Sequence, residues 1–185
     1  FELAYDYIVN NTEKSADKGH KTEEAINKID EDLTRYLIDL SSEPLSQKES
    51  EVLTNILDSS RDLERIGDHG EALINLTDYI RRKKVEFSPA ALQELDLIYN
   101  MTLSFIKESL KSVEDNDIEL ANSLVAKHEA IDKMERRLRK THIHRLNRGE
   151  CSTQAGVNFI DIISHYTRVA DHAMNLAEKV QAEQI

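Results

Sequence analysis

The stretch Arg65-Ile66-Gly67-Asp68-His69 returns later in the chain as Arg168-Val169-Ala170-Asp171-His172. A second similarity precedes each copy, because residues 24–28 (EAINK) return as residues 129–133 (EAIDK). The two pairs occur in the same order and at nearly the same offset, 103 residues (68 to 171) and 105 residues (24 to 129). Such a period is too long for one unit of a solenoid. The pattern predicts an internal duplication, in which each of two similar half-domains carries an Asp-His pair at the same place.

The composition is typical of a charge-rich helical protein. Of the 185 residues, 39% are hydrophobic and 32% are charged, and only two Pro and five Gly interrupt the chain, so long helices are expected. The net charge of −11 argues against nucleic acid as a partner, because binding a phosphate backbone needs clustered Lys and Arg, and it is compatible with binding cations. The one cysteine, Cys151, excludes an intramolecular disulfide framework and fits a reducing compartment.

Apolar residues spaced by three, four and seven predict an all-α fold of six helices. The expected helix starts are Ser46 with Glu49 as a capping box, Ser88-Pro89, Asn116 with Glu119, and Ser152, while the segment 15–22 around Gly19 is expected to separate the first two helices. The predicted helices span residues 1–14, 22–41, 47–84, 89–114, 117–147 and 152–183. Short connections favour antiparallel neighbours. We expect two pseudo-symmetric three-helix bundles, residues 1–86 and 87–185.

The repeated aspartates are expected to point away from the apolar side of their helices. At about 100° per residue, Asp68 lies nearly opposite the third helix's apolar stripe, and Glu64 joins it one turn earlier. Asp171 holds the matching place in the sixth helix. The stripe on the third helix comprises Ile56, Leu63, Ile66, Leu73 and Ile80.

Further acidic residues are expected beside each aspartate. Glu24 and Asn27 on the second helix, and Glu129 and Asp132 on the fifth, are spaced i and i+3, and antiparallel packing would bring each pair towards its own motif. Neighbouring carboxylates repel one another, and a bound cation turns that repulsion into attraction. Carboxylates with an imidazole suit iron, manganese, magnesium or zinc. The alternative is that arginines such as Arg65 neutralise the carboxylates as surface ion pairs.

Residues 62–69 (DLERIGDH) resemble the signature of the PhoU family, which is Glu or Asp, three residues, then Asp. The resemblance implies two similar three-helix bundles, multinuclear iron or zinc clusters exposed at the surface, and a role in regulating phosphate uptake. In the second copy Thr167 stands where the family usually has Glu, which makes that site less complete. The expected metal ligands are Glu64, Asp68 and Asp171, with Glu24, Glu129 and Asp132 in support.

Two further runs, residues 34–37 (TRYL) and 142–149 (HIHRLNRG), resemble the version of this domain at the C-terminus of bacterial sodium/phosphate cotransporters. That resemblance implies a place on the cytoplasmic side of the bacterial inner membrane. The expected partner is the membrane portion of the transporter upstream in the same chain, or a phosphate transport complex, and a homodimer is a further assembly to consider. The start at Phe1 and the short first helix fit an excised piece of such a protein.

The sequence contains no motif that pairs a nucleophile with a base, and it contains no glycine-rich phosphate loop. We therefore expect a non-enzymatic regulatory domain. Two alternatives remain. One is a helical adaptor whose acidic face is solvated and binds no metal. The other is a ferritin-like di-iron oxidase, which needs inward-facing Glu and Glu-x-x-His ligands on four helices.

Overall fold

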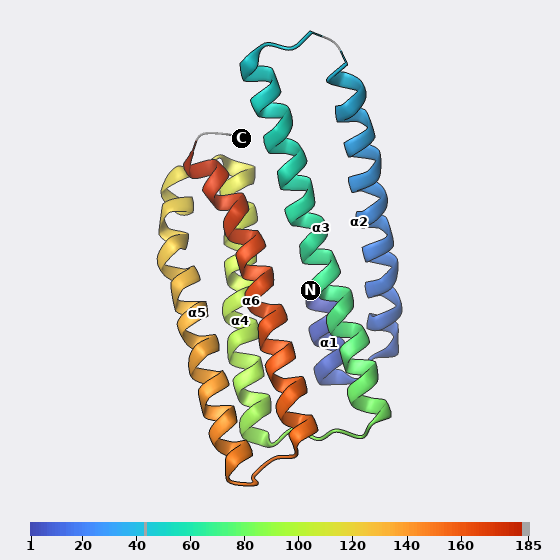
Figure 1. The fold of residues 1–185 in the computed structure, drawn as a ribbon, viewed down its shortest axis with the longest axis vertical. Helices are drawn as coiled ribbons and strands as arrows, with labels where there is room; N and C mark the ends of the chain where they lie inside the picture. Colours follow the sequence, from blue (N-terminus) through green and yellow to red (C-terminus); the bar gives the residue numbers. More distant parts are fainter. Residues whose placement is uncertain (43, 183–185) are drawn as a thin grey trace.

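The computed structural model describes residues 1–42 and 44–182, which form six helices and no strand. The helices are α1 (Glu2–Asn10), α2 (Glu13–Leu40), α3 (Gln47–Arg82), α4 (Pro89–Asp115), α5 (Ile118–Asn147) and α6 (Thr153–Gln181). Successive helices run in opposite directions (Figure 1). The predicted all-α fold is therefore confirmed. Among the described helices, none carries an apolar stretch with the length and hydropathy that a bilayer-spanning segment requires.

Side-chain caps explain where most of the helices begin. The Ser46 hydroxyl accepts from the Glu49 amide while the Glu49 carboxylate accepts from the Ser46 amide, which is the predicted capping box of α3. Ser88 caps α4 ahead of Pro89 at the first helical position, as expected. The start of α5 differs from the prediction by one residue. Asn116, with φ 49°, ends α4, and the side chain of the next residue, Asp117, caps α5.

The predicted break around Gly19 is wrong, because Gly19 lies inside α2. The chain turns instead at Asn11, which adopts a left-handed conformation with φ 57°, and at Thr12, which is extended. A Cβ added to Gly19 would lie 2.3 Å from the Cδ1 atom of Ile74, so the glycine lets α2 approach α3 closely. The glycine therefore marks a close helix contact and not a helix end.

The helices pack as two groups of three. α1, α2 and α3 contact one another, α4, α5 and α6 do the same, and α3 against α6 joins the two groups (Figure 1). Leu73 and Ile74 of α3 belong to the same apolar cluster as Ile98 of α4 and Phe159 and Tyr166 of α6. All five are at most 1% exposed, and burying one such side chain contributes about 1.5–3 kcal/mol. The two groups thus share part of their core, and the repeat boundary at residues 86 and 87 stays a prediction.

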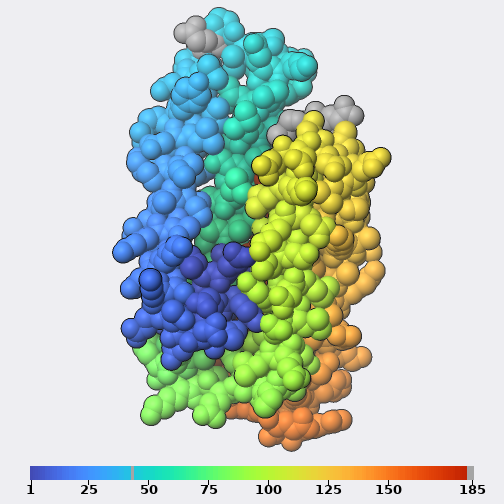
Figure 2. All heavy atoms as spheres, turned by 180° about the vertical axis from the view of Figure 1, so that it is seen from behind, coloured from blue at the N-terminus to red at the C-terminus, as the bar shows by residue number. Residues whose placement is uncertain are grey.

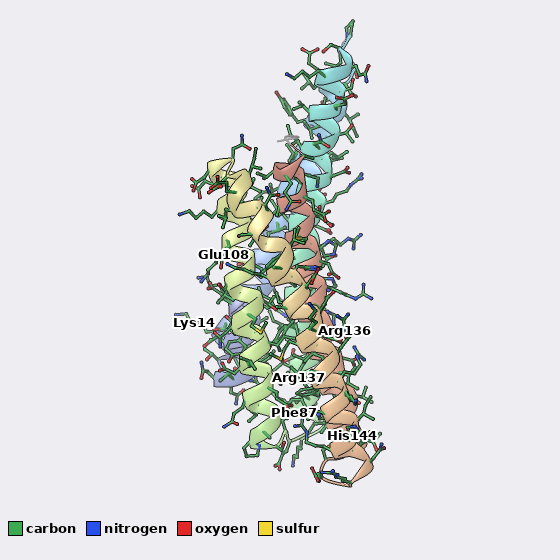
Figure 3. All side chains as sticks on the ribbon, turned by 90° about the vertical axis from the view of Figure 1, so that its left-hand side faces the viewer. Lys14, Phe87, Glu108, Arg136, Arg137 and His144 are labelled. Carbon is green, nitrogen blue, oxygen red and sulfur yellow. The ribbon has the colours of Figure 1, made fainter. Side chains whose placement is uncertain are left out.

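The first group is incompletely covered, because α1 has 9 residues and α4 has 27. α1 lies between α2 and α4 in the lower half of the molecule, and the ends of α2 and α3 nearest their connection project beyond the other helices (Figures 1, 2 and 3). Ile56 and Leu63, which the predicted stripe placed in the core, are 40% and 43% exposed. The prediction is wrong at these two positions because α1 starts beside Gly70, about two helical turns short of Leu63. The other large apolar side chains exposed on α2 and α3 include Ile29, Tyr36, Ile38, Leu40 and Val52.

Candidate metal centre

One surface of the second helix group brings together an imidazole and two carboxylates. His128 and Asp132 of α5 and Asp171 of α6 each offer a ligand atom, and these atoms all lie within 4.8 Å of one another. Nε2 of His128 is 2.9 Å from Oδ1 of Asp171. Within residues 1–42 and 44–182, no other set of three His, Cys, Asp or Glu side chains meets this distance.

Helix geometry places these three side chains together. His128 and Asp132 are four residues apart, so they lie on one face of α5, one turn from each other. Asp171 follows Ala170, which is fully buried, and its own side chain is 51% exposed. The antiparallel packing of α5 and α6 then brings Asp171 to the pair on α5. As predicted, Asp171 points away from the apolar side of its helix.

The electrostatics of this group favour a positive charge between the carboxylates. The hydrogen bond with Asp171 raises the pKa of His128 above its ordinary value, against the opposing effect of burial, and the charge of Asp132 adds to the increase. A proton on His128 or a bound cation would each supply that charge. One imidazole nitrogen and two carboxylates form a donor set that suits zinc, iron or manganese.

On the corresponding surface of the first helix group, an arginine neutralises the carboxylates. Burial raises the pKa of Glu64, and the nearby charge of Asp68 raises it further, while Arg65 opposes both effects. Nη1 of Arg65 lies 3.0 Å from Oδ2 of Asp68, and Nε of Arg65 lies 3.7 Å from Oε2 of Glu64. Arg65 therefore takes the place beside this Glu/Asp pair that a cation would take, as the ion-pair alternative predicts.

Of the three predicted supporting ligands, one lies in the group of three and two do not. Asp132 joins the group, whereas Glu129 points away, is 62% exposed and pairs with Lys133 at 3.0 Å. Glu24 is likewise exposed. Thr167, where the family usually has Glu, donates its hydroxyl to the Ile163 carbonyl of its own helix.

Sequence reasoning missed His128 and its counterpart Glu23, which each precede a predicted ligand by one residue. Glu23 is 9% exposed, bonds Asn27, and contributes to the negative field at Glu64. The spacing of these residues along the sequence could have identified them. Glu23 and Asn27, like His128 and Asp132, are four residues apart, and that spacing keeps side chains on one face better than the three-residue spacing from Glu24 or Glu129.

Both helix groups match a known protein family. The model of the PhoU domain matches residues 1–77 and 95–180, which is most of the chain. The chain belongs to the PhoU family. The match includes both copies of the Asp-His stretch, so the predicted family resemblance is confirmed.

Two curated relatives in the PhoU family are similar over part of their length. The phosphate-specific transport system accessory protein PhoU homolog 1 of Thermotoga maritima is 32% identical over 133 residues, which are 72% of this chain and 56% of that protein. The PhoU homolog of Streptococcus pneumoniae is 28% identical over 126 residues, which are 68% of this chain and 57% of that protein. The chain thus spans a little over half the length of these relatives.

Two crystal structures of PhoU proteins share the fold. The phosphate transport system regulatory protein PhoU of Streptococcus pneumoniae has a TM-score of 0.82 at 22% identity, and covers 97% of this chain and 83% of its own. PhoU of Pseudomonas aeruginosa has a TM-score of 0.86 at 19% identity, with coverages of 97% and 85%. At these identities the likeness shows the fold alone.

Proposed function

We propose that this PhoU-family chain is a non-enzymatic regulatory domain for phosphate transport that binds a metal ion at His128, Asp132 and Asp171. The observation that carries the metal site is the mutual distance of three ligand atoms, all within 4.8 Å. The regulatory role is supported by the family and by the names of the relatives, which are accessory and regulatory proteins of phosphate transport.

Iron or zinc fits this donor set best, because both ions accept a mixture of imidazole and carboxylate ligands. When bound, the ion supplies positive charge that offsets the repulsion between Asp132 and Asp171. Glu64 and Asp68 are the proposed ligands of a second cluster, which requires Arg65 to move aside. Of the two proposed sites, the one on the second helix group is ready to bind without such a movement.

The test is the metal content of protein purified without chelator, measured by elemental analysis after overnight dialysis against trace iron and zinc. Wild type is compared with Asp171→Asn, His128→Gln and, as a matched control, Glu129→Gln, which removes a neighbouring charge outside the group. We expect each of the first two variants to lose the metal equivalent held at this site and the control to keep the wild-type content. Equal metal content in all four proteins would reject the site.

A metal-free helical adaptor is the second candidate, and the Arg65 ion pairs with Glu64 and Asp68 favour it. It predicts no stoichiometric metal in wild type. The di-iron oxidase is disfavoured by position, because His128 and Asp171 lie at the surface and the described apolar clusters occupy the interior. An oxidase would consume oxygen in the presence of ferrous iron, which we do not expect.

We further propose that the domain acts on the cytoplasmic side of the bacterial inner membrane, attached to a sodium/phosphate cotransporter. The support is the resemblance of residues 34–37 and 142–149 to the cotransporter version of this domain. The coding sequence upstream of Phe1 tests this directly. Several apolar segments of membrane length are expected there, and an upstream sequence without them would shift the proposed partner to a separate phosphate transport complex.

A further inference from the structure

Three histidines gather where α3 meets α6. His69 comes from α3, His165 and His172 come from α6, and all three side chains are partly buried. The ring of His69 lies between the other two, with centroid distances of 5.2 Å to His165 and 5.7 Å to His172. This cluster joins the two helix groups and is distinct from the His128 group, which lies between α5 and α6.

The closest contact in the cluster is between two ring nitrogens. Nδ1 of His69 is 3.0 Å from Nδ1 of His165. Two imidazole nitrogens bound to one zinc ion at about 2.0–2.1 Å are separated by about 2.9 Å at a right angle and by about 3.3 Å at the tetrahedral angle. The observed separation falls inside this range, so both nitrogens could bind one ion with little movement of either helix.

The protonation state also suits metal binding, because a metal binds the neutral imidazole. Burial, together with the neighbouring His165, His172 and Arg168, lowers the pKa of His69 to about 4 against the opposing charge of Asp68. Burial also lowers the pKa of His165, which Asp161 partly offsets and Arg168 reinforces. The site itself rests on the 3.0 Å approach of the two Nδ1 atoms.

We infer that His69 and His165 form a two-histidine site for a borderline divalent transition metal such as Zn²⁺, which links α3 to α6. The Nδ1–Nδ1 contact becomes two metal–nitrogen bonds when each ring carries its proton on Nε2. Water completes the coordination, because within the described chain His172 does not come close enough to make a third ligand with these two.

His172 has a separate structural role in this cluster. Its Nδ1 atom is 3.0 Å from Oδ1 of Asp62, so its ring is held towards α3. The inference is independent of the proposed function, since neither His69 nor His165 belongs to the His128 group.

The experiment is equilibrium dialysis of the full chain against ZnCl₂ in the double variant His128→Gln/Asp171→Asn, which removes the first site. Adding His165→Gln should abolish one bound zinc equivalent. Adding His144→Gln should not, because His144 is exposed near the lower end of α5 (Figure 3). Equal zinc binding by the two triple variants would overturn the inference.

Two further measurements keep the test decisive if His165→Gln unfolds. In the folded double variant, zinc should move the ¹⁵N signals of the His69 and His165 Nδ1 atoms and leave that of His144 unchanged; unmoved signals at saturating zinc reject the site. Zinc should also raise the melting temperature of the double variant, since an ion that binds only the folded state stabilises it. Failure of the proposed function appears instead as unchanged metal content in His128→Gln alone.

Discussion

Asp62 accepts three hydrogen bonds across the junction between the two helix groups, and its removal tests how they are joined. Its carboxylate on α3 bonds His172 at 3.0 Å, Asn175 at 2.9 Å and Lys179 at 3.1 Å, all on α6. The side chain is 13% exposed. Asp62→Ala leaves three donors without this acceptor. At about 1 kcal/mol for each bond, the expected loss is about 3 kcal/mol, which lowers the melting temperature by about 6–12 °C.

Asp58→Ala is the matched control, because it removes the same charge one turn away on the same helix. Asp58 is 49% exposed, and its nearest cation, Arg61, is 3.9 Å away. The expected change in the free energy of unfolding is within about 0.5 kcal/mol. Urea denaturation followed by circular dichroism measures both variants. Equal losses in Asp58→Ala and Asp62→Ala would refute the assignment of Asp62 as a link.

The pH dependence of this difference follows from the pKa of Asp62. Burial raises that pKa, but the bonds from Asn175, His172 and Lys179 outweigh the burial and hold it below its ordinary value. A lowered folded-state pKa stabilises the protein above the unfolded-state pKa, about 3.9, and this contribution is lost as the pH falls through the folded-state value. The difference between wild type and Asp62→Ala should therefore be full at pH 6 and shrink below about pH 4. A difference that grows on acidification would contradict the sign.

Three further substitutions test separate parts of the fold by the same denaturation assay. Leu124→Ala should lower the free energy of unfolding by about 3 kcal/mol because Leu124 is fully buried. Val125→Ala, at a side chain that is 44% exposed, should lower it by less than about 1 kcal/mol. Similar losses in the two variants would contradict the assigned core. Ser46→Ala removes the capping box of α3 and should cost about 1 kcal/mol, and no change would mean that the cap is not formed in solution. Gly149 has a φ of 69°, and no atom lies near the position of an added Cβ, so only the backbone conformation opposes a substitution. Gly149→Ala should therefore cost about 1 kcal/mol, and Gly149→Asn should cost less because Asn tolerates this conformation.

Most of the fold was predictable from local signals. Ser46 with Glu49 and Ser88 with Pro89 act through neighbouring residues, and such caps can be read without knowing the tertiary structure. Gly19 misled the prediction because a glycine inside a helix and a glycine at a helix end look alike in sequence. Its role depends on Ile74, which is distant in the chain.

The apolar stripe of α3 shows a different limit. Its periodicity continues through Ile56 and Leu63, but periodicity states only which residues share a face. Whether that face is covered depends on the length of another helix. α1 is too short to reach it, so the same pattern is buried at Leu73 and exposed at Leu63.

The candidate site was predicted in outline. The placement of Asp171 and Asp132 followed from helix geometry, and both lie in the group of three. The histidine in that group, His128, was missed because the repeat drew attention to Glu129, which the duplication preserves. The contact of His69 with His165 was not predicted, because it requires the distance between two helices on opposite sides of the repeat boundary.

The connected ends of α2 and α3 extend beyond the other helices, so a rotation at the base of this hairpin moves its far end the most (Figure 1). α6 ends beside Asp58, and α3 continues from there back to Gln47 for about 16 Å, at about 1.5 Å per residue. A tilt of about 10° at the α3–α6 joint therefore displaces the hairpin's end by about 3 Å, roughly twice the length of a carbon–carbon bond. The geometry of the hairpin would therefore turn a small rearrangement around Asp62 into a larger displacement at its far end.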